Sequence, residues 1–216
     1  MLARPSPDDF ANRLRDAIVS GHFMPNERLI EQDLVKFLGA NRANVRIALG
    51  KLEHEGLVVI EPNRGARVRL VTDQEAVEIM QARGALEGLV ARQAAERATD
   101  ADKERLKALT TQMQTASQEG DLLAFSAING RYHAEIHRIS GNLTATRLLA
   151  NLKSQIVRFQ YRTIMLAGRA RRSLQEHIDI TDAITKGDAD GAERAMQHHL
   201  DEIAVSLTTA ITSERA

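Results

Sequence analysis

A short basic segment followed by glycine- and proline-marked turns constrains the fold of this 216-residue chain more than any other feature. Between Leu34 and Leu52 the segment carries four Lys or Arg residues and no Asp or Glu. Leu34 and Leu38 repeat at helical spacing until Gly39, and the apolar spacing resumes after Asn41. Two helices joined at a glycine are typical of a helix-turn-helix.

The second of these helices has the features of a DNA-reading helix. Asn41 is expected to cap it, and its inner row is Val45, Ala48, Leu49 and Leu52. Arg42 and Arg46 are four residues apart and project from one flank. Because a recognition helix places its first turns at the base edges, we expect it to contact DNA through Asn41, Arg42, Asn44 and Arg46.

A β-hairpin is predicted immediately after this helix. The apolar runs 57–60 and 66–70 are strand-like, and residues 61–65 between them have turn chemistry. Arg64 lies at the expected tip, and Gly65 permits close approach of the backbone to a ligand. An isolated Arg is most simply a solvated surface charge. The placement of Arg64 beside Arg42 and Arg46 instead favours a DNA-contacting wing.

Composition limits the remaining possibilities. The chain has 29 basic and 29 acidic residues, and residues 1–70 hold 11 Lys and Arg against 9 Asp and Glu, so any basic surface must be local. There is no Cys, no apolar stretch long enough to span a bilayer and no apolar core of a signal peptide near Met1. We therefore expect a cytoplasmic protein with no membrane partner.

Residues 10–69 resemble the winged-helix domain of GntR-family bacterial regulators, which implies binding to double-stranded operator DNA. The chain departs from the usual pattern at four positions. The family usually has Gly at Asn26, Ser or Thr at Asn41, Pro or Thr at Asn44, and Glu at Ile47. Asn41 retains a capping oxygen, whereas Asn44 and Ile47 affect the operator preference. The matching motifs are Ile18-x-x-Gly21, Leu29-x-Glu31-x-x-Leu34, Arg42-x-x-Val45-Arg46, Leu52-Glu53-x-Glu55-Gly56-Leu57 and Pro62-x-Arg64-Gly65.

Beyond Thr72 the pattern becomes entirely helical. No Pro follows Pro62, and apolar residues recur at spacings of three and four. The predicted fold is mainly α, with a winged helix-turn-helix at residues 1–70 and an antiparallel all-α helical bundle at residues 71–216. Six helices are expected in the bundle, at 73–98, 101–118, 121–139, 143–166, 170–186 and 189–212.

Three histidines in the second domain are candidate metal ligands. His133, His177 and His199 each lie on the apolar row of a different predicted helix. Imidazoles from separate helices with one oxygen ligand are the usual donors of a zinc, nickel or manganese site. The alternative is that each is a hydrogen-bonded core histidine.

Residues 74–212 resemble the FCD domain, the effector domain of one GntR subfamily, and six helices resemble its VanR-like branch. The resemblance implies that Asn129, His133, His177 and His199 bind a divalent metal, and that Arg83 contacts the effector. The family more often has Asp at Asn129, and a neutral amide is a poorer ligand, so we expect weaker metal retention. The matching motifs are Arg83-x-x-Leu86-Glu87, Asn129-x-x-Tyr132-His133, Ser140-Gly141-Asn142, Glu176-His177-x-x-Ile180, Gly187-Asp188 and Met196-x-x-His199-Leu200.

Other cations of this domain have competing interpretations. Arg83 can instead form a surface pair with Glu87, worth about 0.3–0.5 kcal/mol. Arg158 and Arg162 can line a cavity or be solvated, and solvation is favoured. The run Arg169, Arg171 and Arg172 indicates a charged helix start, where positive charge is unfavourable.

The first hypothesis for function is a metabolite-responsive transcriptional regulator. A palindromic operator requires a two-fold protein, so we expect a homodimer. Effector binding would change the DNA affinity, and a small organic or sugar acid suits a metal-containing site. Repression is favoured because it is the commoner behaviour in the family that the chain resembles.

The alternative is a metal-dependent enzyme built on the helical bundle. Di-metal carboxylate bundles use a Glu-x-x-His motif, and no Glu stands three residues before any His here. No carboxylate with an obvious base role accompanies the three histidines. An RNA or single-strand binder is disfavoured by 3% aromatic residues and no Trp, because few stacking platforms remain. We therefore expect a regulator and no enzyme.

Overall fold

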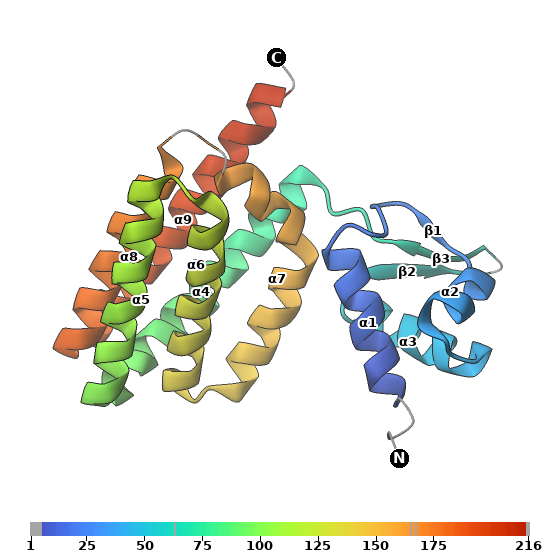
Figure 1. Ribbon diagram of the computed structural model, residues 1–216, viewed down its shortest axis with the longest axis horizontal. Coiled ribbons are helices and arrows are strands. Elements are labelled where there is room, and N and C mark those ends of the chain that lie inside the picture. Colours follow the sequence, from blue (N-terminus) through green and yellow to red (C-terminus); the bar gives the residue numbers. More distant parts are fainter. Residues whose placement is uncertain (1–5, 63, 165, 167, 215–216) are drawn as a thin grey trace. The chain divides into compact units, whose positions relative to one another are not determined.

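The computed structural model describes residues 6–62, 64–164, 166 and 168–214, and it does not describe the side chains of residues 157–164 and 210–214. The described chain is mainly helical with one small sheet (Figure 1). It forms two compact units. The winged unit comprises Met1–Thr72 with Lys153–Val157, and the helical unit comprises Asp73–Leu152 with Arg158–Ala216.

Three helices form the helix-turn-helix part of the winged unit: α1 (Pro7–Val19), α2 (Glu31–Leu38) and α3 (Arg42–His54). α1 begins with a capping box between Ser6 and Asp9. α2 ends at Gly39, whose left-handed φ of 64° favours glycine. The predicted helix-turn-helix is therefore confirmed.

A three-stranded antiparallel sheet completes the winged unit. Its strands are β1 (Arg28–Leu29), β2 (Val58–Glu61) and β3 (Gly65–Val68), in the order β1-β3-β2. Glu61 pairs with Gly65 next to the hairpin turn, as the turn chemistry predicts. β1 is not predicted from the sequence, because two residues are too few to show an alternating pattern. Ala66 and Val68 of β3 are buried with the apolar sides of the three helices.

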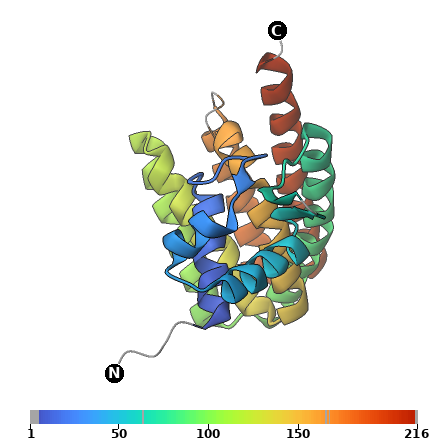
Figure 2. The same cartoon turned by 90° about the vertical axis from the view of Figure 1, so that its right-hand side faces the viewer.

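The helical unit contains six helices among its described residues, and each predicted helix is present with ends within two residues of the prediction. Among the described helices, α4 and α9 pack against each other more extensively than any other pair does. The two helices lie side by side in Figures 1 and 2. No described helix combines the length and the apolar run needed to cross a bilayer. The helices are α4 (Asp73–Arg97), α5 (Asp100–Glu119), α6 (Leu122–Ser140), α7 (Leu143–Ile164), α8 (Arg169–Lys186) and α9 (Ala189–Glu214).

Candidate functional site

The start of α3 is fixed by its cap. Asn41 Oδ1 accepts a hydrogen bond of 2.8 Å from the backbone N–H of Asn44. This contact occupies the acceptor of the Asn41 side chain and leaves its amide N–H groups for a ligand. The opposite side of α3 is buried through Val45, Ala48 and Leu49, which fixes the rotation of the helix about its axis.

Arg42 and Arg46 are both exposed on the flank of α3. Arg46 Nε donates to Glu31 Oε1 at 2.8 Å, and 69% of the Arg46 side chain is exposed. This hydrogen bond lowers the pKa of Glu31, so the carboxylate stays ionised beside the two guanidiniums. The contact between Glu31 and Arg46 was not predicted from the sequence, because Glu31 lies outside the acid-free segment that contains Arg46.

The hairpin turn exposes Arg64 and Gly65. The backbone N–H of Arg64 donates to Glu61 O at 3.0 Å, and Gly65 has a φ of 86°, a left-handed conformation that favours glycine. Apart from its two chain neighbours, no residue that the structure describes places an atom within 4 Å of where a Gly65 side chain would begin. The wing therefore presents a cation and an open stretch of backbone to solvent.

In the helical unit, α6, α8 and α9 bring three histidine rings together. A ring nitrogen from each of His133, His177 and His199 lies within 4.8 Å of the other two, and all three residues are buried. The His177 and His199 ring centroids are 4.5 Å apart. The apolar rows of the sequence predicted the inward direction of these rings, and the tertiary structure determines their closeness.

Hydrogen bonds to Nδ1 fix the orientation of two of these rings. His177 Nδ1 lies 2.5 Å from the backbone oxygen of Ser173, and His199 Nδ1 lies 2.6 Å from Glu176 Oε2. Each Nδ1 therefore carries the proton and donates it, and Nε2 keeps its lone pair. His199 Nε2 is buried and has no hydrogen-bond partner among the described residues.

Asn129 lies on α6 with its Oδ1 atom 2.7 Å from His177 Nε2. Because His177 Nδ1 carries the proton, both of these facing atoms are acceptors. A reversed amide or a cation shared by the two atoms satisfies the pair. The predicted fourth ligand is therefore next to the histidines, and its oxygen can face the same point as they do.

Arg83 is buried, unlike the surface pair considered as its alternative. Its Nη2 atom donates to Glu87 Oε1 at 3.1 Å, and its Nε atom has no hydrogen-bond partner among the described residues. Glu87 Oε2 lies 2.8 Å from His137 Nε2 and 3.5 Å from His133 Nδ1. Glu87 thus links Arg83 to the histidine cluster.

The basic run at the start of α8 differs from the sequence interpretation. Arg171 and Arg172 are exposed, whereas Arg169 is buried and donates two hydrogen bonds of 2.9 Å to Glu176. Glu176 thereby joins Arg169 to His199, as Glu87 joins Arg83 to His133. Arg158 and Arg162 lie outside the residues whose side chains the structure describes.

Burial controls the protonation of the cluster. It lowers the pKa values of His133, His177 and His199, and that of His177 falls to about 3. The three rings are therefore neutral near pH 7. Burial would by itself raise the pKa of Glu87, but His133, His137 and Arg83 together hold it well below its ordinary value. A charged carboxylate beside neutral imidazoles is the arrangement found around metal-bound histidines.

These donors fit a divalent metal. Neutral imidazole nitrogens and an amide oxygen are ligands of zinc, nickel and manganese, and the buried Nε2 of His199 has an unused lone pair. Glu87 and Glu176 lie behind the rings at Nδ1, where outer-shell carboxylates orient metal ligands. The sequence placed Glu87 and Glu176 beside recognised motif residues but did not indicate these contacts.

A DNA-reading head in one unit and a buried polar cluster in a separate helical unit define the class of one-chain DNA-binding regulators. The chain belongs to the gntR family of bacterial regulatory proteins, whose model matches residues 8–68, and the FCD domain model matches residues 78–202. The predicted family and fold class are thus confirmed, and membership places the chain among transcription regulators rather than enzymes.

Named relatives agree with this family, and a solved structure has a similar fold. The chain is 30% identical over 194 residues to the HTH-type transcriptional repressor RspR of Escherichia coli, covering 90% of this chain and 85% of RspR. It is 27% identical over 198 residues to the "Probable D-xylose utilization operon transcriptional repressor" of Paenarthrobacter nicotinovorans, covering 88% and 85% of the two chains. The fold is similar to that of E. coli McbR/YncC, with a TM-score of 0.76, 21% identity and coverage of 95% and 99%.

Proposed function

We propose that this regulator is a metabolite-responsive repressor that acts in the cytoplasm as a homodimer on a palindromic operator. Two relatives named as repressors support the direction of the response. The joint exposure of Arg42, Arg46 and Arg64 on the reading helix and the wing is the observation that carries the DNA-binding part. Asn41, Asn44 and Gly65 complete the proposed contact surface.

The helical unit is proposed to bind a divalent metal and a small carboxylate. His133, His177, His199 and Asn129 would hold the metal, which when bound supplies a positive centre for the effector carboxylate. Arg83 is proposed to contact the same organic or sugar acid, because its buried Nε atom has no acceptor among the described residues. A thermal-shift panel of small carboxylic and sugar acids, run with and without metal, is the search for this effector.

The DNA-binding proposal predicts that the triple variant Arg42→Ala, Arg46→Ala, Arg64→Ala loses operator binding. Loss of a guanine contact by Arg42 or Arg46 should cost about 1–3 kcal/mol, or roughly 5- to 150-fold in affinity, and loss of Arg64 removes a further cationic contact at the wing. Fluorescence anisotropy on the DNA upstream of the protein's own gene, at moderate salt, measures this loss. The control replaces three exposed arginines of the helical unit, Arg131, Arg171 and Arg194. Equal affinity of the two triple variants would contradict the assignment of the contact surface.

The metal proposal predicts that Zn²⁺, Ni²⁺ or Mn²⁺ raises the melting temperature of the wild-type protein. Binding to the folded state alone should add about 2.7 kcal/mol when the free metal is about 100 times its Kd. His199→Ala should abolish this shift, and His198→Ala should keep it, because His198 is exposed one residue away. Identical metal responses of the two variants would place the metal elsewhere.

A further inference from the structure

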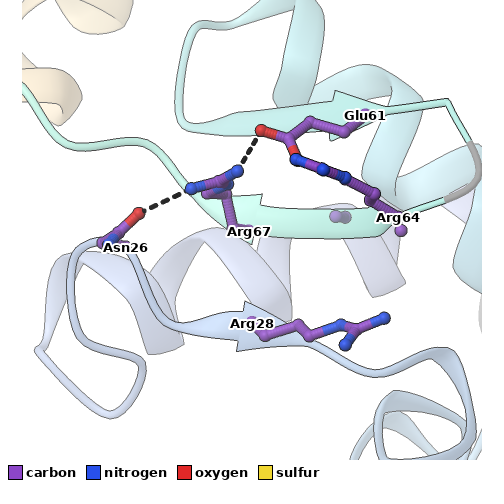
Figure 3. Close-up of a pocket in the computed structure, with 7 residues that line it drawn as sticks. Asn26, Arg28, Glu61, Arg64 and Arg67 are labelled. Carbon is purple, nitrogen blue, oxygen red and sulfur yellow. Dashed lines mark hydrogen bonds and ion pairs between the residues drawn. The ribbon is translucent and has the colours of Figure 1, made fainter.

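Three arginines line one hollow on the winged unit, and two of them are not among the DNA contacts proposed above. The hollow has a volume of about 370 Å³, and its charged lining comes from Arg28, Arg64, Arg67 and Glu61. Figure 3 shows Arg28 on β1, Arg67 on β3 and Arg64 reaching back from the hairpin turn. Asn26 closes the hollow beside Arg67.

Two of these cations are directly opposed in the sheet. Arg28 of β1 pairs in register with Arg67 of β3, so the two side chains share one face. Like charges that face each other across a strand pair destabilise a sheet. Glu61 forms an ion pair with Arg67, and an anion bound between the two guanidiniums would offset the repulsion that remains.

Arg67 is held in place by Asn26, whose backbone conformation is rare for a residue other than glycine. Its Nη1 atom donates to Asn26 Oδ1 at 3.0 Å, and Nη2 contacts Glu61 (Figure 3). Asn26 has a φ of 63° and is the one non-glycine residue with a positive φ in the described chain. Glycine, which the gntR pattern usually has at this position, adopts that conformation more easily but offers no side chain to orient Arg67.

The hollow carries excess positive charge. Three guanidiniums face one carboxylate, and Glu61 is already engaged by Arg67. Neither Arg28 nor Arg64 forms an ion pair with any residue that the structure describes. The unbalanced charge therefore favours an anionic partner.

The position of the hollow identifies the partner. Gly65 and Ala66 line it and also line a second hollow of about 250 Å³, which contains Arg46 of the reading helix and Glu31. The arginine hollow is therefore next to the surface that is proposed to face DNA. A phosphate of the DNA backbone is the anion that lies beside the bases read by such a helix.

We propose that Arg28, Arg64 and Arg67 form a phosphate clamp that holds the DNA backbone beside the operator bases. This inference rests on the proposed DNA-binding function and adds Arg28 and Arg67 to it. Guanidiniums bind phosphate oxygens through paired N–H donors. Such contacts set affinity and register and leave the choice of base sequence to the reading helix.

The test compares Arg28→Ala/Arg67→Ala with Arg171→Ala/Arg194→Ala, which removes the same charge from exposed positions of the helical unit. Affinities for the upstream DNA and for a random duplex of equal length are measured at several salt concentrations. The clamp variant should bind both duplexes more weakly. Its negative slope of log K against log salt should be smaller in magnitude than that of the wild type by about one to two. Its preference for the upstream DNA should remain that of the wild type.

Further variants separate binding from folding. Arg28→Ala should keep or raise the melting temperature, because it removes the opposed charge, and should still weaken DNA binding. Asn26→Gly keeps the backbone conformation and should weaken DNA binding less than the double variant does. A salt slope equal to that of the wild type, or lowered equally by the control, overturns the clamp.

The remaining outcomes are also decisive. Millimolar inorganic phosphate that stabilises the wild type and not the clamp variant, with equal DNA binding by both, would indicate a free-anion site and overturn the clamp. If the clamp variant shows the predicted change in salt slope but the wild type has no preference for any upstream sequence, the result would contradict the proposed regulator and support the clamp. A wild type that binds neither duplex overturns both.

Discussion

At the scale of single residues, Arg169 shows how a cation is accommodated where helix electrostatics disfavour it. Positive charge in the first turn of a helix opposes the macrodipole, yet Arg169 is only 3% exposed at the start of α8. Its two hydrogen bonds to Glu176 satisfy both charged groups in one buried pair. Exposed Arg171 and Arg172 remain in water, where such a dipole effect is small.

Breaking this pair should be costly. We predict that Arg169→Ala lowers the free energy of unfolding by about 3–5 kcal/mol, because it leaves the Glu176 carboxylate buried without its cation. Arg171→Ala, two residues away and exposed, should change it by less than about 0.5 kcal/mol. Urea unfolding of both variants in the metal-free protein measures the difference. Similar midpoints would mean that the pair contributes little to folding.

Residue patterns predicted the candidate ligands better than their supporting partners. His133, His177 and His199 are recognisable because each lies on an apolar row of its own helix. Glu87 and Glu176 gave no comparable signal, since a Glu near an Arg is usually a solvated surface pair. Their contacts with the histidines depend on which helices pack together, and sequence spacing within one helix does not specify that.

At the scale of elements, the start of α5 depends on one carboxylate. Thr99 and Asp102 form a capping box, and the side-chain and backbone hydrogen bonds from Thr99 hold the pKa of Asp102 below its ordinary value of 3.8. Arg138 of α6 contacts the same carboxylate. The cap therefore also ties α5 to α6.

This cap predicts part of the acid sensitivity of the protein. A carboxylate whose pKa is lower in the folded than in the unfolded state stabilises the fold above the unfolded value, and the contribution disappears as the pH falls. We expect the wild type to lose more stability than Asp102→Asn as the pH falls from about 5 to about 2. Asp100→Asn is the control, because Asp100 is fully exposed in the same turn. Chemical denaturation across this pH range would contradict the assignment if Asp102→Asn and the wild type lost stability in parallel.

Element boundaries were largely predictable because capping residues mark them locally. Gly39 ends α2 and Asn41 caps α3 where their chemistry indicated. β1 was not predictable, because its two residues become a strand only by pairing with Ala66 and Arg67 of β3. That pairing also creates the opposed arginines of the proposed clamp, which is why the clamp has no sequence signature.

At the scale of the whole molecule, the proposed function requires two chains. One reading helix contacts one half-site, and a palindromic operator presents two half-sites about 34–36 Å apart. A two-fold dimer places its reading helices on the same face of the duplex at that spacing.

The dimer proposal predicts a strict dependence on half-site spacing. Insertion of about 5 bp between the half-sites rotates one of them to the opposite face of the duplex and should reduce affinity toward that of a single half-site. Sedimentation of the complex should give two chains per operator. A control that substitutes the central bases without changing their number should bind nearly as the wild-type operator does. Full affinity for the lengthened operator would contradict a two-fold dimer with fixed spacing.

The sequence by itself determined the helices, the hairpin, the family and the residue types of the candidate DNA-contact surface and of the candidate metal site. Caps, turns and apolar periodicity act over a few neighbouring residues, and a local pattern is therefore enough to show them. Only the tertiary structure decided which side chains meet across elements. It brought together the three histidines of α6, α8 and α9, placed Glu87 and Glu176 behind them, and set Arg28 against Arg67. These contacts join residues far apart in the chain, and their geometry follows from helix packing and strand register, which no local pattern specifies.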